Sequence, residues 1–431
     1  MKKIEDYRGL RPWLVLWSTQ SLSALGSAMT NFALVLWLYQ KSGSALETAL
    51  LSVCSYAPYV IMSIFAGALS DRWNKRCTML VCDLLAALCT VIVLVLLRAD
   101  ALLPWHMYLL NAINGLMNTV QQPAADVAAT LLIPKKYYQQ TCGLRSLSQS
   151  LNTILTPAIA LALFAFAGME AVIAVDLGTF AVAFIALRRF IRIPELPRNG
   201  GSREPLLSSA ASGLRWLKQN PLILKLILFL AWINLVASAH EAALPAMLLP
   251  RANGGETVLG LVNTCTGVAT MAGSAMATML PAPRSRVRAI CLSLLLSMGT
   301  ENFILAFGRT PMVWCAGSVL GWIAIPLMGA NLDVIFRSTI PAEMQGRVYS
   351  CRNTMQFFTI PVGYLLGGAL VDGVFEPYMA AAAEPALQLF GSGKGSGASA
   401  MLFVLGVVGT AVCLAFCCIL RPYFRKEASE R

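Results

Sequence analysis

Long apolar runs separated by short polar segments are the dominant pattern of the chain. An α-helix needs about 20 largely apolar residues to cross a lipid bilayer, where it satisfies its own backbone hydrogen bonds. The sequence holds twelve such runs, at residues 12–39, 45–70, 77–97, 105–132, 140–167, 169–190, 222–249, 258–280, 289–308, 311–336, 348–371 and 399–420. We therefore predict an all-α integral membrane protein with twelve transmembrane helices.

The composition fits a membrane protein and argues against a nucleic-acid-binding one. Of the 431 residues, 57% are hydrophobic and 13% are charged, whereas about a quarter of the residues of a soluble protein are charged. The net charge of +12 would fit nucleic-acid binding only if the basic residues clustered on a water-facing domain. They lie instead in the short loops, so we expect no nucleic-acid partner.

Sequence signals for catalysis, metal binding and disulfides are missing. The chain has no Walker-type glycine loop, no HExxH motif and no nucleophile beside a base, so neither an enzyme nor an ATP-driven protein is favoured. Most of the 12 cysteines lie singly inside apolar runs, and none forms a CxxC pair, which argues against a disulfide framework or a metal site. We expect no enzyme activity, no cofactor and no metal.

The distribution of Lys and Arg predicts the orientation in the membrane. With both termini in the cytoplasm, all but five of the 33 basic residues lie on the cytoplasmic side, which is a strong positive-inside signal. The N-terminal tail is basic and lacks a small-residue cleavage site, so we expect an uncleaved first helix. The five basic residues left outside are Lys41, Arg98, Arg251, Arg309 and Lys394.

A basic connector divides the chain into two halves. We predict six-helix bundles at residues 1–190 and 222–431, joined by a cytoplasmic connector, 191–221, in which 206–219 forms a short helix on the membrane surface. Four residues of the first half recur in the second at an offset of 207: Asp126, Ile133, Pro134 and Arg145 return as Asp333, Ile340, Pro341 and Arg352. Two pseudo-symmetric bundles of this kind are typical of transporters that rock about a site at the membrane midplane.

The loop between the second and third runs carries the most specific motif. Its sequence, GALSDRWNKR at residues 67–76, resembles the G-x-L-x-D-R-x-G-R-K motif of the major facilitator superfamily. Asn74 stands where the motif has glycine, and both residue types tolerate left-handed backbone angles. The resemblance assigns roles in helix packing and in a cytoplasmic gate to Gly67, Asp71, Arg72, Lys75 and Arg76.

Three further stretches narrow the resemblance. GLRWLKQNP at 213–221 and IPAEMQGRV at 340–348 look like bacterial macrolide-efflux and enterobactin-exporter type facilitators, and FEPYM at 375–379 looks more like the macrolide-efflux branch. The resemblance implies a transporter of the bacterial cytoplasmic membrane that exports a hydrophobic or amphipathic compound by proton-coupled antiport and alternating access. Its implied partners are the small-molecule substrate, protons and membrane lipids, and it implies a monomer.

The fifth run departs from the family pattern. Drug antiporters of this superfamily carry a Gly-Pro-rich signature there, whereas this chain has LTPAIA at 155–160, with the proline but without the glycines. The eleventh run instead carries Pro361, Gly363, Gly367 and Gly368. We therefore expect the close helix packing in the second half.

Charged residues at membrane depth are costly and are candidates for function. We expect a cytoplasmic gate at the inner ends of four helices, in which Lys75 or Arg76 pairs with Asp126 when that side is closed. The alternative is a static set of salt bridges that orients the helices. The predicted gate ring consists of Asp126, Arg145, Asp333 and Arg352.

Two adjacent residues on the seventh run are the candidates for proton coupling. Glu241 can bind and release a proton, and His240 can pass the proton on or hold the carboxylate by a hydrogen bond. For the three other acidic residues at membrane depth, Asp83, Asp176 and Glu301, we expect structural hydrogen bonds because their helices are peripheral in this fold.

Amide side chains on five runs predict the substrate cavity. With the aromatic residues between them, they would line an amphipathic cavity with few fixed charges, which suits a bulky, partly apolar solute. Uptake or symport of another solute remains an alternative function, as does a lipid flippase or sensor on the same fold. The predicted cavity residues are Asn31, Asn118, Gln122, Asn234 and Asn331.

Overall fold

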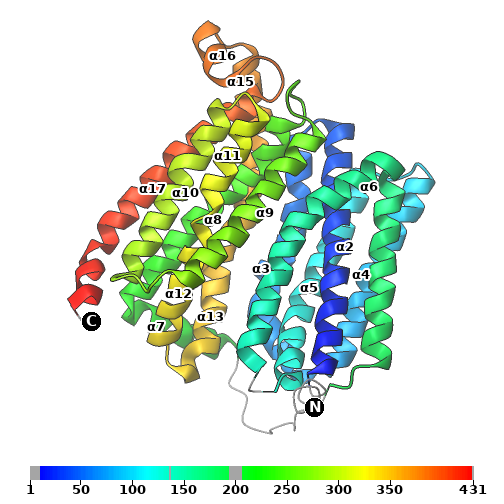
Figure 1. The fold of residues 1–431 in the computed structure, drawn as a ribbon, viewed down its shortest axis with the longest axis vertical. Coiled ribbons are helices and arrows are strands. Elements are labelled where there is room, and N and C mark those ends of the chain that lie inside the picture. Colours follow the sequence, from blue (N-terminus) through cyan, green and yellow to red (C-terminus); the bar gives the residue numbers. More distant parts are fainter. Residues whose placement is uncertain (1–9, 135–136, 194–205, 430–431) are drawn as a thin grey trace. The chain divides into compact units, whose positions relative to one another are not determined.

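The protein is helical throughout the part that the structure describes (Figure 1). The computed structural model describes the backbone of residues 10–134, 137–193 and 206–429. It also describes their side chains, except those of residues 63–72, 138–140, 142–143, 146, 206–210, 342–343, 345–346, 350 and 425–429. No strand occurs within these residues, so the predicted all-α class is confirmed.

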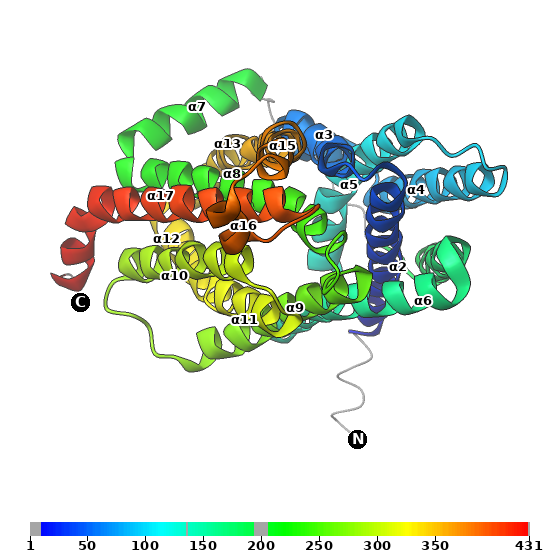
Figure 2. The same ribbon diagram turned by 90° about the horizontal axis from the view of Figure 1, so that it is seen from above.

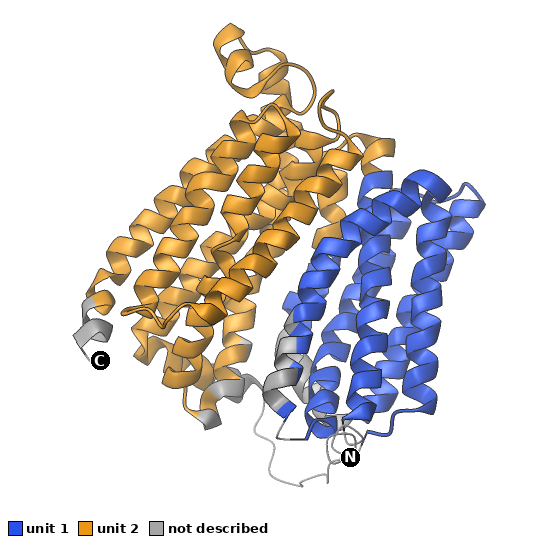
Figure 3. Ribbon diagram, viewed as in Figure 1, with its two compact units in different colours: residues 1–37, 54–206 blue, residues 38–53, 207–431 orange. Residues whose placement is uncertain are grey.

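The helices form two compact units (Figure 3). Unit 1 contains residues 1–37 and 54–206, and unit 2 contains residues 38–53 and 207–431. The end of the first long helix and the start of the second thus belong to the unit that holds the C-terminal half of the chain.

Unit 1 is built from five long helices. The end of the first helix and the start of the second belong to unit 2. The five helices are α2 (Arg11–Ser42), α3 (Ala45–Arg72), α4 (Lys75–Arg98), α5 (Pro104–Leu132) and α6 (Tyr138–Arg189). Gly168 interrupts α6 with φ 74° and ψ −177°, a conformation that favours glycine. Helix α6 is therefore two helices joined at Gly168, in agreement with the two predicted runs that meet there.

A close approach between α3 and α5 packs unit 1. A Cβ atom added at Gly115 of α5 would collide with the carbonyl oxygen of Ser55 on α3. Only glycine allows the two backbones to lie this close. The same region of α5 carries the amide side chains described below, so this contact helps to position them.

We expect Gly115→Ala to destabilise the protein by about 1–3 kcal/mol, because the added methyl group must displace a backbone. Thermal unfolding of the detergent-purified protein measures the effect. Gly178→Ala on α6 is the matched control, since an added Cβ there meets nothing within 4 Å and alanine favours a helix. Equal melting temperatures for the two variants would contradict the close packing of α3 and α5.

Unit 2 contains longer and shorter helices, several of which pack on α8 or on α10 (Figure 2). Its elements are α7 (Leu206–Gln219), α8 (Pro221–Leu248), α9 (Glu256–Met279), α10 (Arg286–Phe307), α11 (Pro311–Trp322), α12 (Ile325–Thr339), α13 (Ala342–Phe357), α14 (Thr359–Leu370), the π-helix η2 (Val371–Phe375), α15 (Glu376–Ala380), α16 (Glu384–Phe390) and α17 (Ser396–Ser429). The predicted helix at 206–219 is thus present as α7, and residues 194–205 of the predicted connector lie outside the described residues.

Proline explains why two predicted runs are broken in unit 2. The run 311–336 is divided into α11 and α12, and Pro326 lies in the first turn of α12. The run 348–371 is divided into α13 and α14, with Pro361 in the first turn of α14. Proline has no N–H to donate and crowds the preceding turn, so it is accommodated where a helix starts.

Close packing on α8 holds α14 in place. A Cβ atom at Gly363 would lie 2.5 Å from the carbonyl oxygen of Leu235, and one at Gly367 would lie 2.8 Å from Cα of Ala239. The close packing expected at the glycines of the eleventh run is therefore observed. On another side of α8, Phe229 stacks on Phe416 of α17 with ring centroids 4.7 Å apart.

Ten stretches of the described residues are long and apolar enough to cross a membrane. The predicted number of twelve is therefore not confirmed as such. The two predicted runs at 140–167 and 169–190 fall within one stretch, Leu147–Arg189, which includes the break at Gly168. Helix α5 has 29 residues but is absent from the ten, since its several amide side chains lower its hydropathy.

Candidate functional site

A cavity of about 570 Å³ lies inside unit 1. Helices α2, α4, α5 and α6 all contribute to its wall, which combines aromatic rings with amide side chains. The rings include Trp13, Trp17 and Phe180. The amides are those of Gln20, Asn31, Asn111, Asn114, Asn118, Gln121, Gln122, Gln149 and Asn152.

Three of the five predicted cavity residues line this cavity. Asn31 extends from α2, and Asn118 and Gln122 extend from α5 one turn apart. Residues four apart lie on the same face of a helix, which explains why both amides face the same space.

The other two predicted cavity residues lie in unit 2. The Nδ2 atom of Asn234 on α8 donates to the carbonyl oxygen of Gln356 at 3.1 Å. Asn331 on α12 is buried, and its Nδ2 atom donates to the carbonyl oxygen of Leu327 at 2.8 Å. Both amides therefore donate hydrogen bonds to backbone carbonyl oxygens within unit 2.

Two carboxylates also stand in the wall of the unit 1 cavity. Asp83 on α4 accepts hydrogen bonds from Gln20 Nε2 at 3.2 Å and from Gln121 Nε2 at 2.6 Å. Asp176 on α6 accepts one from the Ser27 hydroxyl at 3.0 Å. The structural hydrogen bonds expected for Asp83 and Asp176 are present. That both carboxylates face a cavity could not be predicted from the apolar pattern of their helices.

Three polar atoms in the cavity wall are buried without a hydrogen-bond partner in the described structure. They are the indole Nε1 of Trp17, the hydroxyl oxygen of Thr30 and the amide Oδ1 of Asn114. Leaving a buried polar atom unpaired costs about 1–3 kcal/mol. A donor and an acceptor of this kind are suited to a bound molecule with polar groups.

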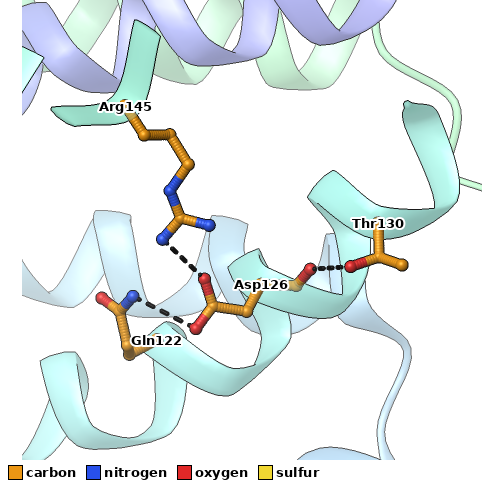
Figure 4. A network of polar contacts seen from close by, with 4 residues as sticks. All are labelled: Gln122, Asp126, Thr130 and Arg145. Carbon is orange, nitrogen blue, oxygen red and sulfur yellow. Dashed lines mark hydrogen bonds and ion pairs between the residues drawn. The ribbon is translucent and has the colours of Figure 1, made fainter. Parts of the chain in front are cut away.

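Asp126 and Arg145 form an ion pair at the edge of the same cavity (Figure 4). Arg145 Nη2 of α6 lies 2.9 Å from Asp126 Oδ1 of α5. Gln122 Nε2 donates to the other carboxylate oxygen at 3.4 Å, and the Thr130 hydroxyl donates to the Asp126 backbone carbonyl at 2.9 Å. The two charged side chains are 49% and 46% exposed, so water reaches the pair.

The corresponding residues of unit 2 have different neighbours. Arg352 donates to Gln356 Oε1 at 3.0 Å and covers the Phe336 ring at 4.7 Å. Asp333 is exposed on α12. In the described part of unit 2, no ion pair equivalent to Asp126–Arg145 joins Asp333 and Arg352.

The motif at 67–76 covers the turn between α3 and α4. The side chains of Gly67, Asp71 and Arg72 lie outside the described residues. Asn74 has φ −63° and ψ 118°, and its side chain accepts a hydrogen bond from Cys77 N at 3.1 Å. Asn74 is thus the N-cap of α4, and its backbone is not in the left-handed region.

The two described motif cations contact carbonyl groups. The guanidinium of Arg76 donates to the carbonyl oxygens of Leu187, at 3.2 Å, and Arg188, near the C-terminal end of α6. A cation there stabilises the unpaired carbonyls of the last helical turn. Lys75 Nζ donates to the carbonyl oxygen of Trp73 at 3.4 Å. Asp126 has Arg145 as its partner in this structure.

A buried polar cluster joins α8, α10 and α11 in unit 2. His240 Nδ1 lies 2.8 Å from Asn302 Oδ1, and His240 Nε2 lies 3.8 Å from Glu301 Oε1. The indole N–H of Trp322 donates to the same Glu301 oxygen at 3.0 Å. The predicted proton-coupling residue His240 thus contacts Glu301, whereas the other predicted residue, Glu241, is exposed.

One carboxylate of η2 caps the start of α3 within unit 2. Asp372 accepts hydrogen bonds from the backbone N–H groups of Ala45 and Leu46, at 3.1 and 2.9 Å, and from the Ser44 hydroxyl at 2.6 Å. A carboxylate at a helix N-terminus pairs with unsatisfied N–H groups and with the positive end of the helix dipole. Beside it, a Cβ at Gly368 would lie 2.5 Å from Cα of Leu46, so backbone packing adds to the contact.

A second carboxylate, one helical turn later, caps α17. Glu376 Oε1 accepts from the N–H groups of Gly395 at 2.9 Å and Ala398 at 3.3 Å. Two carboxylates on adjacent turns, Asp372 in η2 and Glu376 in α15, thus cap the N-termini of two different helices, α3 and α17. π-Helices occur often at functional sites, and the sequence pattern did not identify Asp372 or Glu376.

Arg251 connects loop and helix residues near the start of α17 in unit 2. It donates to the carbonyl oxygens of Phe390 at 2.8 Å and Gly395 at 3.3 Å, and to the Ser399 hydroxyl at 2.5 Å. Burial, and then the nearby Arg309, lower the pKa of Arg251 to about 10, while Glu376 acts in the opposite direction. The guanidinium stays charged at neutral pH and can satisfy these acceptors.

A family model matches more than half of the chain. The model of the Major Facilitator Superfamily matches residues 16–251. The match begins in α2 and continues beyond the end of α8.

Curated relatives and solved structures extend the comparison over most of the chain. "Macrolide efflux protein A" of Streptococcus pyogenes is 23% identical over 83% of this chain and 89% of its own. "Enterobactin exporter EntS" of Escherichia coli O1:K1 / APEC is 26% identical over 72% of each chain. A mutant of the nucleoside transporter NupG has a similar fold, with a TM-score of 0.70 at 12% identity, over 95% of this chain and 99% of that one.

Proposed function

Since the chain belongs to the major facilitator superfamily and is therefore a multi-pass membrane transporter, we propose that it exports a hydrophobic or amphipathic organic compound from the cytoplasm. The observation that carries the proposal is the unit 1 cavity, which combines aromatic rings, amides and unpaired polar atoms. The relatives named for macrolide and enterobactin export support the direction. In this proposal the energy comes from proton antiport.

The proposed membrane is the bacterial cytoplasmic membrane, with both termini in the cytoplasm. The halves 1–190 and 222–431 rock against one another about the connector 191–221 and expose the solute site to one side at a time. The concentration of Lys and Arg in the segments assigned to the cytoplasm supports this orientation.

The solute occupies the unit 1 cavity. Its apolar body lies against Trp13, Trp17 and Phe180, and its polar groups meet the amides of Asn31, Asn118 and Gln122. The unpaired atoms of Trp17 and Asn114 gain partners when a solute with polar groups is bound. A cavity of this volume suits a compound of drug size.

The cytoplasmic gate uses Asp126 and the basic residues around it. In the state described here Arg145 is the partner of Asp126, and closing of the cytoplasmic side brings Lys75 or Arg76 to the same carboxylate. Asp333 and Arg352 serve the second half in the corresponding place, and Gly67, Asp71 and Arg72 support the turn between α3 and α4.

The opposite, outer gate uses the cap that Asp372 places on α3. Residues 38–53 pack with the C-terminal half in this structure, and their release from η2 opens the outer side. Proton coupling takes place on α8, where Glu241 and His240 are adjacent. These assignments give each side of the membrane a gate and place the coupling group in the half opposite the solute cavity.

The proposed function predicts lower accumulation of bulky amphipathic compounds in cells that make the protein. We expect expression in an energised, pump-deficient bacterial host to reduce the accumulation of macrolides severalfold, with little change for small hydrophilic compounds. Asn118→Leu should weaken efflux about threefold to tenfold, because it removes one hydrogen bond worth about 0.5–1.5 kcal/mol.

The matched control is Asn331→Leu, since the Asn331 amide bonds to its own helix in unit 2. Its effect on macrolide accumulation should be smaller than that of Asn118→Leu at equal expression. Accumulation that does not depend on the protein across a broad panel would exclude export. Transfer of a fluorescent lipid between leaflets would point to a flippase instead.

A further inference from the structure

The cluster around Glu301 is buried and built from three helices. Glu301 and Asn302 of α10 are 5% and 1% exposed, and His240 of α8 is 6% exposed. Trp322, at the end of α11, completes the cluster with its hydrogen bond to Glu301. A carboxyl group is stable in such a place only if it is protonated, or if a nearby cation compensates the charge of the carboxylate.

The geometry identifies the atom at which a proton can be exchanged. Asn302 Oδ1 is an acceptor, so His240 Nδ1 at 2.8 Å carries a hydrogen and donates it. The second ring nitrogen, Nε2, faces Glu301 Oε1 at 3.8 Å. The pair of Nε2 and the carboxylate is therefore the place where one proton can be held, as imidazolium with carboxylate or as imidazole with carboxylic acid.

Glycine and tryptophan on α11 make room for the carboxylate and orient it. A Cβ atom at Gly321 would collide with Glu301 Oε2. Trp322 Nε1 donates to Oε1 at 3.0 Å, which stabilises the charged form of the carboxylate. After the proton is lost, this hydrogen bond partly stabilises the remaining carboxylate. A group that binds and releases a proton in each transport cycle needs such stabilisation of its charged form.

Further ionisable groups on the neighbouring helices are few. Glu241, the next residue of α8, is exposed. Asp333 and Arg337 of α12 are exposed, and Lys225 of α8 lies over the Tyr423 ring. The remaining ionisable groups on the described helices that pack against α10 are the thiols of Cys315, Cys413, Cys417 and Cys418, together with Glu384, Arg421 and Tyr423.

We infer that Glu301 is the final binding site of the coupling proton, shared with Nε2 of His240. Only a proton moves in this relay: Nε2 of His240 gives it to the Glu301 carboxylate or takes it back. The inference rests on the proposed proton antiport and adds to it the buried acceptor.

The relay explains how a proton can bias the conformation of unit 2. With the proton bound, the cluster has no net charge and stays buried where α8, α10 and α11 meet. Without the proton it has a net negative charge, which favours a state in which these helices admit water. Proton binding at Glu301 thus favours the tightly packed state.

Tryptophan fluorescence of the purified full-length protein tests the site without a transported solute, because Trp322 touches the carboxylate. We expect a pH-dependent component in the wild-type protein that is lost in Glu301→Gln and in Trp322→Phe. The matched control Glu384→Gln, an exposed carboxylate on α16, should keep it. The same pH-dependent component in Glu301→Gln as in the wild type would overturn the inference.

Transport in proteoliposomes distinguishes this inference from the proposed function. With a radiolabelled macrolide as the probe, we expect Glu301→Gln to lose accumulation driven by a pH gradient at least tenfold and to keep downhill exchange within about threefold. If the wild type ignores the pH gradient, the proposed antiport fails. If the wild type responds and Glu301→Gln responds equally, only the assignment of Glu301 fails.

A second set of variants keeps the test decisive if Glu301→Gln does not fold. Trp322→Phe removes a donor to the carboxylate, so the pH of half-maximal transport should rise by about one unit. Gly321→Ala should disturb the pH profile, whereas Gly329→Ala, which meets nothing within 4 Å, should not. Profiles identical to the wild type in both Trp322→Phe and Gly321→Ala would exclude the relay.

Discussion

Replacing Asp372 by alanine is expected to open the outer side of the transporter and to lower export about tenfold or more. Asp372 accepts two backbone hydrogen bonds at the N-terminus of α3 and one from Ser44. Hydrogen bonds to a charged group contribute about 1.5–3 kcal/mol each, and the helix dipole adds to them. A net loss of about 2 kcal/mol would shift the equilibrium between closed and open outer gates about thirtyfold.

The reporter for this prediction is Ala49→Cys in a chain whose native cysteines are replaced. Ala49 is 2% exposed and faces Gly368, so an impermeant thiol reagent reaches the new cysteine only when residues 38–53 leave η2. Labelling should be faster with Asp372→Ala than with the matched control Glu384→Gln, which changes an exposed carboxylate. Ser44→Ala should be intermediate, because the two backbone bonds to Asp372 remain.

Equal labelling rates in Asp372→Ala and Glu384→Gln would show that Asp372 does not hold the outer gate. Reduced export with unchanged labelling would place the effect elsewhere in the transport cycle. The melting temperature of the purified variant separates both outcomes from a loss of folding.

Reversing one charge of the Asp126–Arg145 pair is expected to reduce export at least tenfold. Asp126→Arg places two cations within contact distance and removes the carboxylate that the proposed gate uses in both of its states. The pair is about half exposed, so its contribution to stability is at most about 1 kcal/mol. The variant should therefore fold and reach the membrane at a normal level, and the loss should be one of transport.

Second-site changes then identify the partner of Asp126 in each state. Arg145→Asp should restore part of the export lost in Asp126→Arg, because it re-forms the pair seen in this structure. Lys75→Asp should also restore part of it if Lys75 takes over when the cytoplasmic side closes. Export and cytoplasmic cysteine accessibility that stay unchanged in Asp126→Asn would contradict the gate assignment altogether.

Most helices could be predicted from the sequence, because apolar length is a strong signal in a membrane protein. The breaks inside predicted runs were harder to place. Pro326 and Pro361 start new helices at α12 and α14, although proline within a run is also compatible with a bent, continuous helix. Helix α5 shows a different difficulty, because its amide side chains lower its hydropathy. The residues that line the cavity therefore weaken the apolar signal by which a membrane-spanning helix is recognised.

Sequence reasoning identified part of the cavity but did not relate Glu301 to His240. Asn118 and Gln122 could be found because polar residues on one face of an apolar helix are unusual. A structural hydrogen bond was expected for Glu301 because its helix is peripheral in this fold, and the Trp322 indole donates one. Nothing in the sequence relates position 301 to His240. The two residues meet only through the packing of α8 and α10, which is a tertiary property.

The division of α2 and α3 between the two units has a consequence for recombination between related transporters. Residues 38–53 lie early in the chain but pack on η2 and α14 of the C-terminal half. A chimera that exchanges the C-terminal half at the connector alone would leave this hairpin facing a foreign surface. The exchangeable module is therefore discontinuous, and a chimera built to retain activity would move residues 38–53 together with residues 207–431.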